Sequence, residues 1–272
     1  MRYLFFLLLI FSYNVDSKVP EPSYGLPELA SEAWVKELNS KKRAKVMTPS
    51  VARKMQKVLE SLDEAGILEQ EKALLKKDKK EKEANAKDIE IKRAIANGQK
   101  ELDDLKPRLA SLKSYDRSMY YYYQSYYNLA YQDKISDAIK NYINVVNEED
   151  TTEKLRVEAY YVLAQLYLSE SNYRAGVDYL LKWFKYTGEV KADGYVLLGQ
   201  AYYLLADKES SKSKILASKQ KAFNNVLKAK SLADEKQISF RENWYSLLLA
   251  SMSELELKEE QVPLYEQILE LY

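Results

Sequence analysis

Apolar residues recur at helical spacing along most of the chain beyond residue 50. The first such run holds Val51, Met55, Val58, Leu59 and Leu62. Intervals of three and four place these residues on one face of a helix. Thr48-Pro49-Ser50 reads as the start signal of that helix, with Ser50 as its N-cap. Before it, the breakers in residues 18–49 predict an extended segment with one short helix in SEAWVKELNS, which has Trp34 and Leu38 on one face.

Residues 70–98 follow a different pattern, in which charged residues and alanine replace most of the apolar positions. This composition predicts a helical, coiled-coil-like arm that ends at a C-cap formed by Asn97-Gly98. Two interpretations remain open. The arm is either a solvated extension stabilised by ion pairs or a projection that docks a partner. It lies within a helical region expected over residues 50–113, where helices at 51–68 and 100–113 flank it.

Residues 114–272 contain an internal repeat of helix pairs. The expected repeats cover residues 118–150, 156–189, 191–231 and 240–272, and the second helix of the third repeat follows an insertion at 208–218. In the second repeat, Tyr160, the pair Leu163-Ala164 and Tyr167 recur along the first helix, and Gly176 opens the second. The small position of each first helix is assigned to Tyr126, Ala164, Gly199 and Leu248. The pattern predicts an all-α fold, an α-solenoid of paired helices with a charged helical extension near its N-terminal side.

Residues 118–131 read SMYYYYQSYYNLAY, in which half of the positions are tyrosine. In the register given by Tyr126, residues Tyr122, Tyr126 and Leu129 face the core. Tyrosine combines a large apolar body with a polar tip and suits a binding surface. The stripe left over and its counterparts in later repeats form the predicted partner-binding groove: Tyr120, Tyr123, Tyr127, Tyr131, Tyr161, Gln165, Gln200, Tyr203 and Tyr245. The alternative is that residues 18–50 fold back and bury the stripe.

Composition removes most catalytic chemistries from consideration. The chain has no cysteine and no histidine, which excludes the usual zinc sites and the Ser-His and Cys-His nucleophile pairs. Phosphate-binding and dinucleotide-binding glycine motifs are also missing. With Lys+Arg 42 against Asp+Glu 41, the net charge of +1 gives no reason to expect nucleic acid as a partner. We expect no enzymatic activity, no cofactor and no metal site.

The N-terminus has the pattern of an export signal. Arg2 is followed by an apolar run from Tyr3 to Tyr13, which is too short for a membrane span of roughly 20 residues. Val15 and Ser17 supply the small residues of a cleavage site, so residues 1–17 are predicted to be a signal peptide cleaved after Ser17. A buried helix at the start of a cytosolic domain is the alternative.

The repeats resemble the tetratricopeptide (TPR) pattern, most closely at Tyr195, Leu198-Gly199 and Tyr202. In detail, residues 48–272 resemble the exported TPR proteins of TonB energy-transduction systems in Gram-negative bacteria. The blocks that carry this resemblance are YLLKWF and ENWY, in residues 179–184 and 242–245. The resemblance implies a periplasmic, non-enzymatic accessory protein that binds periplasmic segments of TonB- or ExbD-type proteins in a TonB/ExbB/ExbD-type complex. The charged segments at 70–98 and 208–218 depart from that family.

Two other functions compete with this scaffold interpretation. One is an exported coiled-coil and repeat factor that coordinates cell-envelope synthesis or constriction and oligomerises through residues 70–113. The other is a repeat protein whose tyrosine-rich groove stacks on glycans.

Overall fold

The computed structural model describes residues 23–39 and 45–271, and every regular element in these residues is a helix. The expectation of an all-α protein is therefore confirmed. The chain divides into two compact units. The larger unit comprises residues 28–188, and the smaller unit combines residues 23–27 with 189–271. The predicted signal peptide lies outside the described residues.

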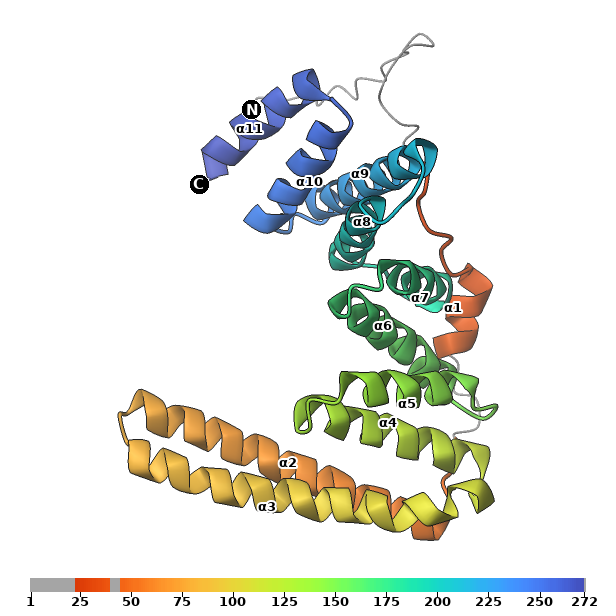
Figure 1. The fold of residues 1–272 in the computed structure, drawn as a ribbon, viewed down its shortest axis with the longest axis vertical. Helices are drawn as coiled ribbons and strands as arrows, with labels where there is room; N and C mark the ends of the chain where they lie inside the picture. Colours follow the sequence, from red (N-terminus) through yellow and green to blue (C-terminus); the bar gives the residue numbers. More distant parts are fainter. Residues whose placement is uncertain (1–22, 40–44, 272) are drawn as a thin grey trace, which may run out of the picture. The chain divides into compact units, whose positions relative to one another are not determined.

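Helices follow one another with short connections throughout both units (Figure 1). The larger unit contains α1 (Glu32–Asn39), α2 (Pro49–Lys77), α3 (Glu81–Leu105), the 3-10 helix η1 (Lys106–Ser111), α4 (Ser114–Ala130), α5 (Ile135–Asn147), α6 (Glu153–Ser169) and α7 (Tyr173–Tyr186). The smaller unit contains α8 (Ala192–Ala206), α9 (Lys212–Glu235), α10 (Glu242–Glu254) and α11 (Lys258–Leu271).

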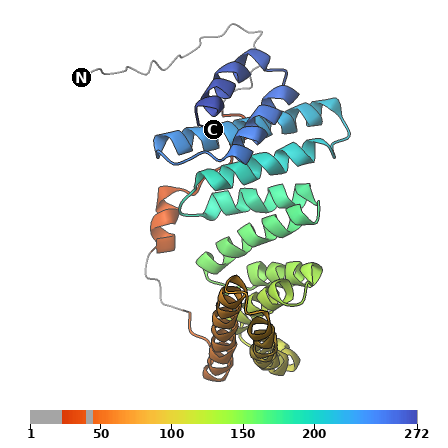
Figure 2. The ribbon, with the colours of Figure 1, turned by 90° about the vertical axis from the view of Figure 1, so that its left-hand side faces the viewer.

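The charged segment 70–98 is part of a helical hairpin made by α2 and α3, which run side by side (Figures 1 and 2). It comprises the end of α2, the turn at 78–80 and most of α3. Asn97-Gly98 is not a C-cap, because α3 continues to Leu105 and Gly98 is buried inside it. The helix expected at 100–113 is instead the last turn of α3 followed by η1.

Small side chains form much of the seam between α2 and α3. Ser61, Ala65, Ala84, Ala94 and Gly98 are buried along it. Such residues let two helix backbones approach closely. The larger Val51, Met55, Val58 and Leu102 pack in the core cluster that the hairpin shares with α4.

Ion pairs link α2 to α3 at two places, one near the turn and one near the opposite end of the hairpin. The Lys54 ammonium lies 2.8 Å from a carboxylate oxygen of Glu101 and 2.9 Å from one of Asp104. Nearer the turn, Lys87 pairs with Glu71 at 2.8 Å and Lys72 pairs with Asp88. The ion pairs expected for this segment are thus present, although each exposed pair contributes only about 0.2–1 kcal/mol.

A buried carboxylate joins the start of α2 to the start of α4. Asp116 is 1% exposed and accepts hydrogen bonds from the Thr48 backbone N–H at 2.9 Å and the Thr48 hydroxyl at 2.5 Å. Thr48 is the N-cap residue and Pro49 the first residue of α2, so assigning the cap to Ser50 was wrong. Proline suits this first position because its missing N–H would have no helical partner there.

The expected repeats coincide with pairs of packed helices: α4 with α5, α6 with α7, α8 with α9, and α10 with α11. Small residues sit where the helices of a pair meet. A Cβ added at Gly176 would lie 3.4 Å from the Ala164 carbonyl oxygen, and one at Gly199 would lie 2.5 Å from a Val226 methyl. The expected insertion at 208–218 is wrong in part, because residues from Lys212 onward form the first turns of a longer α9.

The first helix pair has a different register from the one expected. Ser125, not Tyr126, occupies the small position: it is fully buried, and its hydroxyl contacts the Ala138 carbonyl oxygen at 3.3 Å. Tyr126 is 43% exposed. Because one residue of an α-helix corresponds to about 100° of rotation, this shift turns a different set of tyrosines toward the core.

In the described part of the segment before α2, α1 packs against the end of α7 and the residues that follow it. In the larger unit, the Trp34 indole N–H of α1 donates to the Tyr186 carbonyl oxygen at 2.8 Å, and Leu38 lies beside Gly188. The expected face of α1 is confirmed. None of the helices formed by the described residues is both long and apolar enough to span a bilayer.

Candidate partner-binding groove

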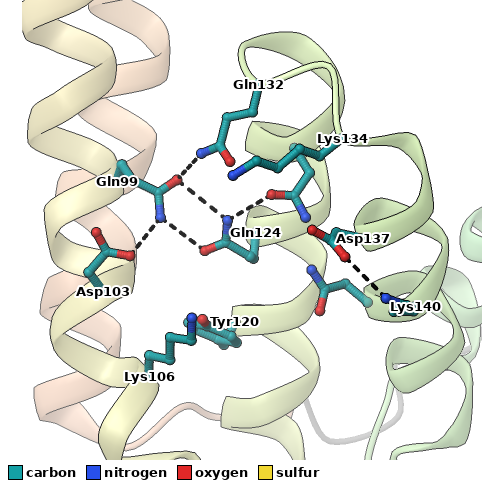
Figure 3. Close-up of a pocket in the computed structure, with 11 residues that line it drawn as sticks. Gln99, Asp103, Lys106, Tyr120, Gln124, Gln132, Lys134, Asp137 and Lys140 are labelled. Carbon is teal, nitrogen blue, oxygen red and sulfur yellow. Dashed lines mark hydrogen bonds and ion pairs between the residues drawn. The ribbon is translucent and has the colours of Figure 1, made fainter.

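A solvent-open groove of about 470 Å³ lies between the end of α3 and the α4–α5 pair (Figure 3). One wall comes from α3 and η1, and the other from one face of α4 with the start of α5. Most of the lining is polar: Gln99, Asp103, Lys106, Tyr120, Gln124, Asn128, Gln132, Lys134, Asp137, Lys140 and Asn141. The groove is thus a cleft between the hairpin and the first helix pair.

Side-chain amides connect the two walls of the groove. The Gln99 and Gln124 amides form a reciprocal pair, with N–O distances of 3.0 and 3.4 Å. The Gln124 amide also donates to Asn128 at 3.1 Å, and the Gln132 amide donates to the Gln99 oxygen at 2.9 Å. Gln99 completes the network by donating to Asp103 at 2.9 Å. Figure 3 shows this network spanning the groove.

An amide pair of this kind has the same hydrogen-bonding capacity as two peptide groups, since each side chain both donates and accepts. A peptide backbone entering the groove can exchange hydrogen bonds with Gln99 and Gln124 without leaving a donor unpaired. Asn128 is only 4% exposed and fixes the position of Gln124. The network therefore holds two half-buried amides ready for a polar ligand.

Tyr120 and Lys106 lie together at one end of the groove (Figure 3). Tyr120 is 3% exposed, and burial, with a smaller contribution from the Asp103 carboxylate, raises its pKa to about 12. The phenol is neutral at physiological pH, so it can donate a hydrogen bond. At the α5 side, Lys140 pairs with Asp137 at 3.3 Å. Charges of both signs thus line the groove, and no single sign dominates it.

Two members of the predicted tyrosine stripe are core residues. Tyr127 is 0% exposed and, like Tyr120, belongs to the apolar core that α4 shares with α2 and α3. The Tyr127 hydroxyl is buried without a hydrogen-bond partner, and a Cβ at Gly98 would lie 1.8 Å from it. Placing Tyr127 on a groove surface was wrong. The α2–α3 hairpin packs against this part of the stripe, and Met47, from the segment before α2, packs against the same core cluster.

The other two members of the stripe are half-buried. Tyr123 packs against the same core cluster, with its ring 5.4 Å from that of Tyr122. Tyr131 packs edge-on against Tyr127 at 5.6 Å and Tyr126 at 6.1 Å, and burial raises its pKa to about 12. Neither lines the groove described above. Of the stripe, only Tyr120 does.

The remaining predicted residues do not join this groove. In α6, Tyr161 packs against Trp183 at 4.9 Å, whereas Gln165 is exposed. Gln200, Tyr203 and Tyr245 belong to the smaller unit. There Gln200 is exposed and Tyr203 half-buried, but Tyr245 is 3% exposed and packs against Phe240 at 4.9 Å. The assignment of Tyr245 to a surface was therefore wrong.

The amides that connect the groove walls are not among the residues predicted from the sequence. A signal existed: Gln124, Asn128 and Gln132 recur every four residues among the tyrosines, which places them on one side of α4 and its C-terminal turn. Gln99, by contrast, lies in a charged helix and carries no such signal. It becomes a groove residue only through the way that α3 packs on α4.

Within the residues that the structure describes, no three acidic side chains converge as they would around a metal ion. Comparison with protein-family models, with curated proteins and with solved structures gave no match to this chain.

Proposed function

We propose that this protein is a non-enzymatic, TPR-like helical-repeat scaffold that binds a polypeptide segment of a protein partner. The observation that carries the proposal is the amide network across the groove, with Gln99 and Gln124 presenting peptide-like hydrogen-bonding groups. Consecutive helix pairs with small residues at their contacts support the TPR-like description. The neutral Tyr120 phenol and the mixed charges of the rim suit a polar peptide.

The partner class comes from the resemblance to the exported TPR proteins of TonB systems. On that basis the protein is periplasmic, and its partners are periplasmic segments of TonB- or ExbD-type proteins. The leader-like residues 1–17 support export. Mass spectrometry of the protein isolated from the periplasm of a Gram-negative host tests the export proposal. We expect Lys18 as the first residue of the mature chain.

The coiled-coil alternative is less well supported. Its oligomerisation was expected through residues 70–113, but the seam residues of that region are buried within the chain's own α2–α3 hairpin. The glycan-binding alternative would use the hydrogen-bond donors and acceptors that the groove also offers. Recovery of the protein on purified cell-wall sacculi, without binding to protein segments, would support that alternative.

The decisive experiment is a pull-down and titration with recombinant periplasmic segments of TonB- and ExbD-type proteins. The double substitution Gln99→Ala and Gln124→Ala removes the amide pair, and we expect affinity to fall about tenfold or more, as loss of roughly two hydrogen bonds implies. Gln165→Ala is the matched control, because Gln165 is exposed on α6 outside the groove. Equal affinity of the double variant and the wild type would refute the groove assignment.

A further inference from the structure

A turn of the chain before α1 is held on the surface of α9 in the smaller unit. Ser23–Leu26 forms a β-turn, closed by a hydrogen bond of 3.2 Å from the Leu26 N–H to the Ser23 carbonyl oxygen. Gly25 occupies its third position with φ +75°. Within such a turn the carbonyls of the two central residues have no partner inside the turn and need donors elsewhere.

Two neighbouring asparagines of α9 supply those donors. The Asn224 amide donates to the Tyr24 carbonyl oxygen at 2.9 Å, and the Asn225 amide donates to the Gly25 carbonyl oxygen at 3.0 Å. Asn225 also donates to the Lys221 carbonyl oxygen of its own helix at 2.8 Å, which fixes its orientation. The surface thus recognises the main chain of a turn.

These asparagines are unusual for their position. Asn224 is 2% and Asn225 0% exposed, and the neighbours Ala222, Phe223 and Val226 are buried and apolar. A buried amide that lacks its hydrogen bonds costs about 1–3 kcal/mol. Each of these two asparagines directs an amide hydrogen bond to the main chain of the turn, so the pair forms a site for a main-chain occupant.

Side-chain contacts add sequence selectivity. The Lys221 ammonium lies 5.8 Å from the centre of the Tyr24 ring and 5.3 Å from that of Tyr202, within the range of cation–π attraction. A Cβ on Gly25 would lie 2.1 Å from the Lys221 Cγ, so only glycine fits there. Pro27 is buried. The site therefore reads an aromatic–Gly–x–Pro sequence in a turn.

Part of the occupant faces solvent. Ser23 and Tyr24 remain exposed, and each of the two hydrogen bonds is worth only about 0.5–1.5 kcal/mol. We propose that this face of α9 is a recognition site for a partner peptide carrying an aromatic–Gly–x–Pro turn, and that residues 24–27 occupy it as an intramolecular competitor. This site is separate from the amide groove and does not depend on the function proposed for it.

The test uses a fluorescent synthetic peptide of residues 23–29, SYGLPEL, titrated against the full mature chain with anisotropy as the readout. Gly25→Ala in the protein expels its own turn, because alanine is strained at φ +75° and collides with Lys221. We expect the peptide to bind this variant about tenfold or more tightly than the wild type. Adding Asn225→Ala to Gly25→Ala abolishes that gain. Gly66→Ala, where a Cβ meets nothing within 4 Å, behaves as the wild type.

A folding control accompanies the titration. Circular dichroism tests whether Gly25→Ala keeps its helices. If that variant loses helix, the double variant Tyr24→Ala and Pro27→Ala replaces it, because these substitutions loosen the turn without backbone strain. Failure of the peptide to bind either opened variant, or equal binding to the wild type, overturns the proposal. So does a dimer that forms through residues 23–27, since the occupant would then be a second copy of this chain.

Discussion

At the scale of single residues, Gly98 and Tyr127 decide how the hairpin meets the first helix pair. The Tyr127 side chain is fully buried, and its hydroxyl reaches the α-carbon of Gly98 in α3. Glycine is unfavourable inside a helix by about 1 kcal/mol relative to alanine. Its presence here follows from the close approach of the phenol, which leaves no room for a methyl group.

We predict that Gly98→Ala destabilises the protein although alanine is the better helix former. The new Cβ would lie 1.8 Å from the Tyr127 hydroxyl and 2.9 Å from the Ser61 Cβ, and overpacking of this kind costs about 1–3 kcal/mol. After subtraction of the gain in helix propensity, about 1 kcal/mol, we expect a net loss of up to about 2 kcal/mol in the free energy of unfolding, measured by urea denaturation.

Two variants calibrate this measurement. Gly66→Ala in α2 has free space around the new methyl group and should gain about 0.5–1 kcal/mol. Tyr127→Phe removes a buried hydroxyl that has no hydrogen-bond partner, so alone it should cost little, and combined with Gly98→Ala it should reduce the loss. If Gly98→Ala were as stabilising as Gly66→Ala, Tyr127 would not be seated against Gly98.

A single residue also explains why the candidate site was predicted only in part. The tyrosine run contains no obvious small residue to fix the register. The prediction placed Tyr126 at the small position, whereas Ser125 is the residue that contacts α5 there. The resulting rotation moved Tyr127 from the core to the predicted surface. Tyr120 lies at the boundary between core and cleft, because it is buried in the core cluster and also lines the groove.

At the scale of helices, several turns that follow a helix contain a residue in the left-handed backbone conformation, which the sequence does not predict. Five of them hold a non-glycine residue with positive φ, and four of these residues share one hydrogen-bond pattern: Lys79, Ser171, Gln237 and Glu256. The N–H that follows each one donates to the carbonyl oxygen five residues back, at 2.8–3.0 Å. This is the Schellman arrangement, in which glycine is the usual residue. Helix ends were therefore harder to predict than helix existence.

Replacing such a residue with glycine should stabilise the hairpin. Lys79 has φ 60° in the turn between α2 and α3, where a residue with a Cβ costs about 1 kcal/mol or more. We expect Lys79→Gly to raise the free energy of unfolding by about 0.5–1 kcal/mol in urea denaturation. Ala86→Gly, at an exposed position inside α3, should lower it by about 1 kcal/mol. A loss with Lys79→Gly would contradict the left-handed turn.

The hairpin itself shows the limit of hydrophobic periodicity. The charged segment was correctly predicted to be helical, but its partner helix was not identified. Much of the seam consists of alanine, serine and glycine, residues that a search for large apolar side chains does not count. Packing against α4 then supplies the groove wall, which is a tertiary property and has no local pattern.

At the scale of the whole molecule, buried tyrosines make stability depend on alkaline pH, and they do so unequally in the two units. In the larger unit, burial raises the pKa of Tyr120, Tyr131 and Tyr142 to about 12. Burial, together with a hydrogen bond to Glu158, also raises the pKa of Tyr122. In the smaller unit, Tyr195 and Tyr203 show a raised pKa.

A raised pKa in the folded state means that folding favours the neutral phenol. Its contribution to stability is complete below the unfolded pKa of about 10 and is lost as pH rises through the folded pKa. We therefore predict constant stability up to about pH 9 and a steep loss between about pH 10 and 12. Because more of these tyrosines lie in the larger unit, that unit should unfold at the lower pH.

Tryptophan emission separates the two units in this experiment. Trp244→Phe leaves Trp34 and Trp183, which report on the larger unit. The double substitution Trp34→Phe and Trp183→Phe leaves Trp244, which reports on the smaller unit. The emission maximum, followed from about pH 8 to about pH 12 beside tyrosinate absorbance, should shift first in the Trp244→Phe variant. Tyr142→Phe should move that transition to higher pH, since it removes one ionisable group whose folded pKa is raised. Simultaneous loss of both signals, or earlier loss of the Trp244 signal, would show that tyrosine ionisation does not set the order of unfolding.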